Sequence, residues 1–251
     1  MEAYLIIDQG NTTTKMSIYT SDGTLIQNDT VNSLSHGALI NFISDRPITA
    51  AIYSSVGDTP ADLHRWLADI TPLVIALNAS TPCPLVLDYF TPDTLGSDRL
   101  AAAVGAYCIP ECHNRDILVV DMGTAITYDR VNATGVYSGG NIAPGIALRL
   151  KALSSFTARL PIINREDIAQ HYTTVWGKTT TSAMVAGAVR GVVAEIEYYR
   201  SISPKDTAVV ITGGDAELFA DLLPKTFIVR RDLVAFGLFN IIRRIADPLS
   251  A

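Results

Sequence analysis

The sequence predicts an α/β protein made of two similar halves, each with a mixed sheet flanked by helices. The segments from Leu5 to Thr14 and from Leu118 to Thr127 share one pattern: an apolar run, then Asp-x-Gly, then small hydroxyl or amide residues. The two aspartates, Asp8 and Asp121, are 113 positions apart in a chain of 251 residues. The repeated pattern therefore indicates a duplicated unit. Strand-length and helix-length patterns alternate through both halves, which is typical of layered α/β folds.

The length and composition fit this organisation. A chain of 251 residues corresponds to one large or two small domains. Hydrophobic residues make up 48% of it and charged residues 18%, which supplies a core and argues against disorder. Pro110 and the polar run 111–116 interrupt the apolar pattern near the middle. We therefore predict a first domain over residues 1–115 and a second over residues 116–251.

The acidic balance restricts the expected partners. The chain has 19 Lys and Arg against 25 Asp and Glu, a net charge of −6, which argues against nucleic acid or an anionic membrane as the main partner. No basic targeting segment is visible, and the charge-free stretch 70–87 contains prolines that suit no membrane span. The three cysteines form no paired framework, which predicts reduced thiols in a cytoplasmic protein.

Each element of the first half has a local signal. The turn 21–23, Ser-Asp-Gly, separates two strand-like runs, and Pro60 suits the first turn of a helix. The alanine-rich run behind Gly96 favours a helix. After the strand that ends at Asp8, the expected elements are strands over 15–19, 24–31, 49–55 and 73–77 and helices over 58–70 and 97–107.

The second half is interpreted in the same way. The expected strands cover 117–121, 125–130, 134–138, 208–212 and 227–230, and the expected helices follow Pro144, cover 180–199 and 233–246, and run from the Gly213-Gly214 turn to about 223. An apolar stripe on the long helix suits either a dimer interface or packing in the protein's own core. The stripe consists of Met184, Val185, Ala188, Val192, Val193 and Ile196.

The first Asp-x-Gly turn has the groups that a phosphate site needs. Gly10 lets the backbone approach a ligand, while Asn11, Thr12 and the neighbouring amides supply hydrogen-bond donors. Asp8 suits a Mg²⁺ ion, directly or through water, and Lys15 offers positive charge to the same phosphates. An ordinary turn remains an alternative for one copy, but two copies are suited to grip a polyphosphate.

Three further segments have two interpretations each. Gly213-Gly214, between a strand and a helix, suits a nucleotide base or ribose or a simple turn. The Gly- and Pro-rich run 138–145 suits contact with a substrate or a change of chain direction, and the hydroxyls of 179–181 suit a helix cap or a ligand. No Gly-x-x-x-x-Gly-Lys-Ser/Thr motif occurs, so a P-loop enzyme is not indicated.

The segment 96–99, Gly-Ser-Asp-Arg, heads the alanine-rich helix. Asp98 suits a capping role in the first helical turn or a catalytic role toward a substrate. Arg99 suits pairing with an anionic substrate group or a surface pair with its neighbour.

Taken in order, these motifs resemble those of type III pantothenate kinases. The resemblance covers nearly the whole chain and rests on Asp8-x-Gly-Asn-Thr with Lys15, Tyr89-x-x-Pro92, Gly96-x-Asp98-Arg99, Asp121-x-Gly-Thr-Ala, Gly139-Gly140-x-Ile-x-Pro-Gly and Thr212-Gly-Gly. It implies two ribonuclease-H-like domains of the actin-like, sugar-kinase-like and Hsp70-like ATPase superfamily. It also implies ATP-dependent phosphorylation of pantothenate, the first step of coenzyme A biosynthesis, by a homodimer that uses Mg²⁺ and potassium or ammonium.

The resemblance also implies roles for single residues. Asp98 is expected to act as the base toward the pantothenate hydroxyl, and Asp121 to lie near the monovalent cation. The family commonly has Asn where Thr179 stands, next to the expected substrate residue Thr180. The expected ATP-binding residues are Asp8, Gln9, Gly10, Asn11, Thr12, Thr13, Thr14, Lys15 and Thr124, and the expected pantothenate-binding residues are Tyr89, Gly96, Ser97, Asp98, Arg99 and Thr180.

Two other functions remain open at this point. One is a different small-molecule kinase or a phosphatase of the same superfamily, acting on a sugar or a short acid. The other is a non-catalytic accessory factor for transcription, since the resembled family includes proteins with that name. The presence of Asp8, Asp98 and Asp121 argues against a loss of catalysis, and the net charge of −6 argues against direct DNA binding.

Overall fold

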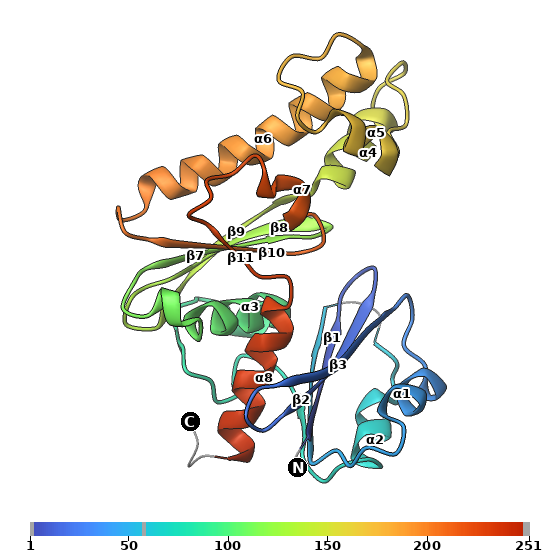
Figure 1. Ribbon diagram of the computed structural model, residues 1–251, viewed down its shortest axis with the longest axis vertical. Helices are drawn as coiled ribbons and strands as arrows, with labels where there is room; N and C mark the ends of the chain where they lie inside the picture. Colours follow the sequence, from blue (N-terminus) through green and yellow to red (C-terminus); the bar gives the residue numbers. More distant parts are fainter. Residues whose placement is uncertain (1–2, 57–58, 248–251) are drawn as a thin grey trace. The chain divides into compact units, whose positions relative to one another are not determined.

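The computed structural model in Figure 1 describes residues 3–56 and 59–247. It contains two sheets with helices packed on them. The strands are β1 (Ala3–Gln9), β2 (Thr14–Thr20), β3 (Leu25–Val31), β4 (Ala50–Ser55), β5 (Val74–Ala76), β6 (Val86–Leu87), β7 (Ile117–Met122), β8 (Ala125–Val131), β9 (Val136–Pro144), β10 (Ala208–Thr212) and β11 (Ile228–Val229). The α-helices are α1 (His36–Ile43), α2 (Leu63–Ala68), α3 (Ser97–Tyr107), α4 (Ile146–Ser155), α5 (Arg165–His171), α6 (Thr180–Ile202), α7 (Ala216–Ala220) and α8 (Leu233–Ala246). Short 3₁₀ turns cover Pro92–Thr94 and Pro110–Cys112.

The two sheets repeat one strand order, which confirms the predicted α/β class with mixed sheets. The first sheet runs β3-β2-β1-β4-β5, and the second contains the equivalent series β9-β8-β7-β10-β11, with β6 added beside β9. In each sheet the central strand, β1 or β7, is antiparallel to the next strand in sequence and parallel to a later one. Asp8 and Asp121 lie near the ends of these central strands, so the repeated Asp-x-Gly motif occupies equivalent positions in the two sheets.

The chain forms two compact units. Unit 1 comprises residues 1–113, 134–138 and 232–251, and unit 2 comprises residues 114–133 and 139–231. The terminal helix α8 is therefore part of unit 1, where it packs on α3, β1 and β4. The boundary between domains 1–115 and 116–251 stays a prediction of the sequence.

The core of unit 1 fills both faces of the first sheet. On one face the side chains of β1 and β2 pack against α1 and α2 in a cluster that includes Leu5, Ile7, Leu39 and Leu67. On the other, α3 and α8 lie so close that their backbones nearly touch. A Cβ atom added at Gly237 of α8 would come within 1.8 Å of the Ala101 carbonyl oxygen of α3.

This contact leads to a stability prediction. Gly237→Ala forces the two helix backbones apart and is expected to destabilise the protein by about 1–3 kcal/mol. Gly187→Ala is the matched control. Gly187 lies inside α6, and apart from its own stretch of helix no described residue has an atom within 4 Å of an added Cβ, so alanine there favours the helix by up to about 1 kcal/mol. Urea unfolding of both variants measures the difference. Equal midpoints would show that the α3–α8 contact is not tight.

The core of unit 2 lies between the second sheet and α6, which crosses it as the long orange helix of Figure 1. The apolar stripe of α6 packs here against Val120, Ile126 and Ile211. The stripe is therefore core, and its interpretation as a dimer interface was wrong. Amphipathic periodicity shows that a helix buries one face but not which partner covers it.

Several expected elements differ in length. The helix expected over 58–70 covers only Leu63–Ala68, and Asp58 lies outside the described residues. The strand expected over 134–138 begins at Val136 and continues to Pro144, so the run 138–145 is mostly strand. Helices α1 and α5 and strand β6 were not predicted.

No helix within residues 3–56 and 59–247 combines the length and the apolar character that crossing a membrane requires.

Candidate active site

The first Asp-x-Gly segment forms the tip of the β1–β2 hairpin. Asp8 and Lys15 face each other across the two strands, and the Gly10 N–H donates to the Thr13 carbonyl at 3.0 Å to close the turn. Asp8 is buried, whereas Lys15 is exposed. The other predicted phosphate-binding residues lie at or next to this tip: Gln9, Gly10, Asn11, Thr12, Thr13 and Thr14.

The N-terminus of α3 is attached beside this hairpin. Asp8 of β1 is in parallel register with Ser54 of β4. The buried Ser54 hydroxyl lies 2.9 Å from the hydroxyl of Ser97, the first residue of α3, which also accepts from the Ser55 N–H at 3.1 Å. These contacts bring the Gly-Ser-Asp-Arg segment to the carboxyl end of β1, so residues about 90 positions apart in sequence share one site.

Asp8 and Asp98 influence each other's charge. The pKa of Asp8 is raised to about 6: burial is the largest cause, the Asp98 carboxylate adds to it, and the Lys15 ammonium opposes it. A buried carboxyl next to a second carboxylate favours a cation or a proton between them. The arrangement therefore fits a divalent cation brought in with a phosphate group.

The first turn of α3 holds both charged residues of the motif. The Asp98 Oδ1 accepts from the Arg99 N–H at 2.8 Å, inside the turn that follows the N-cap Gly96. Arg99 is only 7% exposed, which contradicts its interpretation as half of a surface pair. The planar guanidinium of an arginine is suited to bidentate pairing with a carboxylate.

Tyr89 also belongs to unit 1. It follows β6, is partly buried, and its ring packs against that of Tyr137, with the centroids 6.0 Å apart. The described contacts do not join Tyr89 to Asp98, so its role toward a substrate stays a prediction.

The second Asp-x-Gly segment forms the β7–β8 hairpin of unit 2. Asp121 faces Thr127 across the hairpin and is in parallel register with Thr212 of β10. Beyond Thr212, Gly213 has a φ of 96°, and an added Cβ would come within 2.5 Å of the Met122 backbone. The chain therefore turns at Gly213 in contact with the backbone of the second hairpin. A residue with a side chain would not fit at this position.

A buried hydroxyl oxygen belongs to the residue opposite Asp121. Thr127 Oγ1 is buried and makes no hydrogen bond within the part of the chain that the structure describes. Its neighbour across the strands is the partly buried Asp121. A hydroxyl and a carboxylate oxygen are hard ligands, so this position fits a monovalent cation.

A cavity of about 850 Å³ lies in unit 2 beyond the Gly-Gly turn. Its lining combines Gly214 and Asp215 with apolar side chains such as Ile146, Ile163 and Ile168. This volume and mixed lining are typical of sites for small organic ligands.

The threonine run 179–181 begins α6. Thr179 is the N-cap: its hydroxyl accepts from the Ser182 N–H, and the Ser182 hydroxyl accepts from the Thr179 N–H in return. This supports the helix-cap interpretation for Thr179. Thr180, the first helical residue, is exposed.

Sequence reasoning missed Ser54, Thr127 and the pair Arg149 and Glu195, which is described below. Ser54 stands at the end of a predicted strand, and a parallel alignment of that strand with β1 was the only signal for it. Thr127 belongs to the second copy of the turn motif, opposite Asp121.

Comparisons with known proteins agree with these motifs. The family model for type III pantothenate kinase matches residues 4–201. The chain is 38% identical to a type III pantothenate kinase of Porphyromonas gingivalis over 96% of this chain and 98% of the relative. It is 36% identical to that of Phocaeicola vulgatus over 95% of this chain and 97% of the relative.

Solved structures share the fold. A protein described as a Baf family transcriptional activator from Campylobacter jejuni superposes with a TM-score of 0.60 at 23% identity, over 98% of this chain and all of that chain. A protein described as an N-acetylmannosamine kinase from Listeria monocytogenes superposes with a TM-score of 0.60 at 13% identity, over 98% of this chain and 99% of that chain. MreB 5 of Spiroplasma citri bound to AMPPNP superposes with a TM-score of 0.52 at 11% identity, over 100% of this chain and 98% of that chain. At these identities the likeness concerns the fold alone, which is that of actin-like ATPases and sugar kinases.

A family model spanning most of the chain and relatives matched along nearly their whole length decide the family. The protein belongs to the type III pantothenate kinase family and is a phosphotransferase.

Proposed function

We propose that this protein transfers the γ-phosphoryl group of ATP to the primary hydroxyl of pantothenate and so forms 4'-phosphopantothenate, the first intermediate of coenzyme A biosynthesis. The buried Asp8 carboxyl beside Asp98 at the start of α3 supports the proposal most directly. It combines a carboxylate suited to a metal–phosphate complex with a second carboxylate suited to a hydroxyl.

The hairpin of residues 8–15 binds the ATP phosphates in this proposal. The turn amides and the hydroxyls of Thr12 and Thr13 donate to phosphate oxygens, and Lys15 contributes charge. The second hairpin contributes Thr124. The cavity beside Gly214 receives the base and ribose, which its apolar lining and adjacent polar groups favour.

Pantothenate binds at the start of α3 in this proposal. Arg99 pairs with the pantothenate carboxylate, and Gly96, Ser97 and Tyr89 complete its contacts. Thr180 reaches the substrate across the interface of the proposed dimer. Asp98 orients the hydroxyl and accepts its proton while the oxygen bonds to the γ-phosphorus and the bond to ADP breaks. The proton leaves late, so Asp98 does not need to be a strong base beforehand.

A divalent metal accompanies ATP in kinases, and we propose Mg²⁺ here, held through Asp8. When bound, Mg²⁺ neutralises phosphate charge and Asp8 keeps its position. We propose potassium or ammonium beside Asp121, because Thr127, whose buried hydroxyl has no hydrogen-bond partner among the described residues, is its neighbour across the strands.

We further propose a homodimer. With the α6 stripe buried, the support comes from large apolar side chains elsewhere in unit 2: Phe156 is 89% exposed, Ile162 86% and Trp176 86%. Exposed apolar groups of this size favour association. Light scattering at micromolar concentration measures the molar mass, and a monomer would contradict the dimer.

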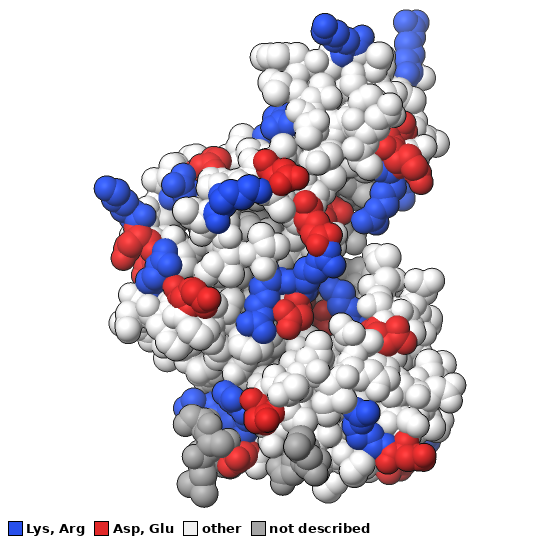
Figure 2. Space-filling model, in the orientation of Figure 1, with Lys and Arg blue, Asp and Glu red and all other residues white. Residues whose placement is uncertain are grey.

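We propose a cytoplasmic protein without nucleic acid or membrane partners. The described cysteines Cys83, Cys108 and Cys112 are free thiols, and burial raises the pKa of Cys108 to about 11. On the face shown in Figure 2, basic side chains are interspersed with acidic ones, and the net charge is −6.

ADP release with a panel of acceptors tests the function. With ATP, Mg²⁺ and potassium, we expect release with pantothenate and background rates with hexoses, N-acetylmannosamine and short hydroxy acids. Sodium in place of potassium is expected to lower the rate. Turnover of another acceptor but not pantothenate would favour a different small-molecule kinase. ATP binding without turnover of any acceptor would favour a regulatory protein.

A further inference from the structure

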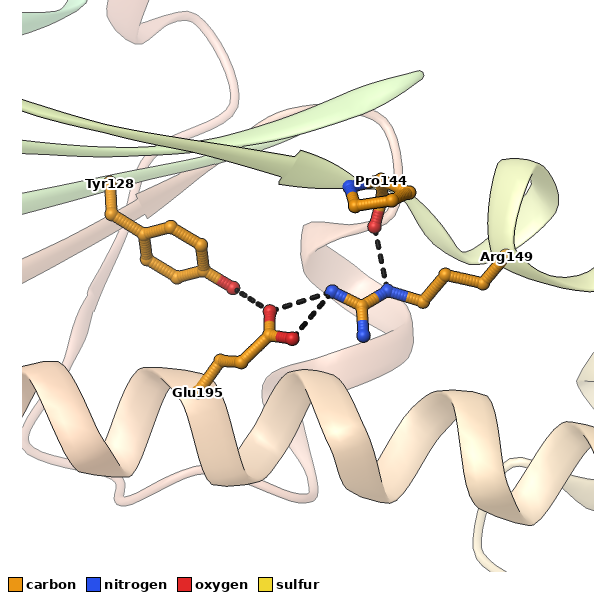
Figure 3. Close-up of polar contacts among 4 residues, drawn as sticks. All are labelled: Tyr128, Pro144, Arg149 and Glu195. Carbon is orange, nitrogen blue, oxygen red and sulfur yellow. Dashed lines mark hydrogen bonds and ion pairs between the residues drawn. The ribbon is translucent and has the colours of Figure 1, made fainter.

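A charged network in unit 2 joins β8, a strand of the second hairpin, to α4 and α6 (Figure 3). The Arg149 Nη2 donates to both oxygens of Glu195, at 2.8 and 2.6 Å, and the Tyr128 hydroxyl donates to the same carboxylate at 2.8 Å. The Arg149 Nε donates to the Pro144 carbonyl at 2.7 Å. The network thus joins β8, the end of β9, α4 and α6.

The network is partly buried. Tyr128 is 2% exposed, and the side chains of Arg149 and Glu195 are 19% and 35% exposed. Burial and the hydrogen bond to Glu195 raise the pKa of Tyr128, so its hydroxyl stays protonated and remains a donor. The pair is thus less exposed to solvent than a typical surface pair, whose contribution is small.

Gly145, the residue after Pro144, contacts the Gly123–Thr124 turn of the second hairpin. The Gly145 N–H donates to the Thr124 carbonyl at 3.0 Å. A Cβ added at Gly145 would come within 2.2 Å of the Gly123 carbonyl oxygen and 2.7 Å of that of Thr124. Both turn carbonyls therefore face Gly145.

The orientation of these carbonyls fixes the amides. In a trans peptide the C=O and the next N–H point in opposite directions. With the carbonyls of Gly123 and Thr124 directed at Gly145, the N–H groups of Thr124 and Ala125 point away from it. Oriented amides of this kind form anion-binding concavities.

The contacts close a ring. It runs from the Thr124 turn along β8 to Tyr128, through Glu195 and Arg149 to Pro144, and through Gly145 back to the turn. An arginine is suited to this place because its planar fork bonds a carboxylate and a carbonyl at once.

We propose that Arg149, held by Glu195 and Tyr128, is a positioning residue that sets the Gly123–Thr124 turn for the phosphates of ATP. This rests on the proposed function, which assigns that turn to ATP. Arg149 acts through Pro144 and Gly145. Loss of its side chain is therefore expected to weaken nucleotide binding and leave pantothenate binding unchanged.

The test compares Arg149→Met with Arg200→Met. Arg200 is also an arginine of unit 2 paired with a glutamate, Glu197 at 3.0 Å, but it lies on α6 away from the turn contacts described here. For Arg149→Met we expect the KM for ATP and the Kd for AMPPNP to rise about tenfold, and the KM for pantothenate to change less than twofold. Arg200→Met is expected to leave all three within twofold.

A merely structural network would lower the Tm and leave the KM for ATP unchanged, and that result would overturn the proposal. If Arg149→Met does not fold, Arg149→Lys carries the test, because it keeps the charge but lacks the fork. Its KM for ATP must then rise about threefold, and a change below twofold would equally overturn the proposal. If the wild type does not phosphorylate pantothenate, the proposed function fails separately, and the AMPPNP Kd alone decides whether Arg149 positions the turn.

Discussion

Asp98→Asn is expected to lower kcat for pantothenate phosphorylation by on the order of 10²-fold or more, because the amide cannot take the proton of the attacking hydroxyl. The fold is expected to survive, since the asparagine oxygen still accepts from the Arg99 N–H. The KM for ATP is expected to change little, because the phosphate-binding hairpins are untouched. Steady-state kinetics with both substrates varied measures these effects.

Asp69→Asn is the control for this variant. Asp69 is an exposed carboxylate of unit 1 at the end of α2, and its loss is expected to leave kcat within twofold. A near-normal kcat in folded Asp98→Asn protein would reject Asp98 as the base.

Asp8→Asn is expected to stabilise the ligand-free protein while reducing its activity. A folded pKa of about 6, above the ordinary 3.8, means that the fold prefers the neutral carboxyl. The stability that this group contributes is complete below pH 3.8 and is lost as the pH rises through 6. The shift of about two pKa units corresponds to about 3 kcal/mol as an upper limit, which the neutral amide would recover above pH 7.

Urea unfolding without Mg²⁺ or nucleotide, repeated from pH 4 to 8, measures this effect. We expect Asp8→Asn and the wild type to be similar near pH 4 and the variant to be more stable at pH 8. Activity is expected to fall by about tenfold or more, because the amide holds a divalent cation poorly. A variant less stable than the wild type at pH 8 would show that the charged form of Asp8 is not penalised by burial.

The sequence predicted the elements whose signals are local and strong. The helix at 97–107 and that at 233–246 were predicted with their observed bounds, as was the strand at 208–212. Each is a dense apolar or alanine-rich run with a polar or glycine boundary. Of the missed helices, α5 has a capping box between Asn164 and Asp167 that the sequence does contain, so it was recognisable.

The remaining differences depend on tertiary packing. The Gly- and Pro-rich run after Ser138 continues as a strand because β9 pairs with a neighbouring strand, and local turn propensity loses to those hydrogen bonds. The α6 stripe is visible in the sequence, but its burial in unit 2 is not.

The candidate site was predictable only in part. The turns at Asp8 and Asp121 were visible as a repeat, and the family resemblance supplied Asp98. The Ser54–Ser97 contact joins residues 43 apart, and the Arg149–Glu195 pair joins residues 46 apart. Such contacts follow from strand register and helix packing, and no sequence spacing indicates them.

Identification of the reaction product tests the central proposal most directly. The purified protein is incubated with ATP, Mg²⁺, potassium and pantothenate, and the products are examined by phosphorus NMR and mass spectrometry. The account predicts one new phosphomonoester on the primary hydroxyl of pantothenate, in an amount equal to the ADP formed. ADP accompanied only by inorganic phosphate, with pantothenate unchanged, would contradict it.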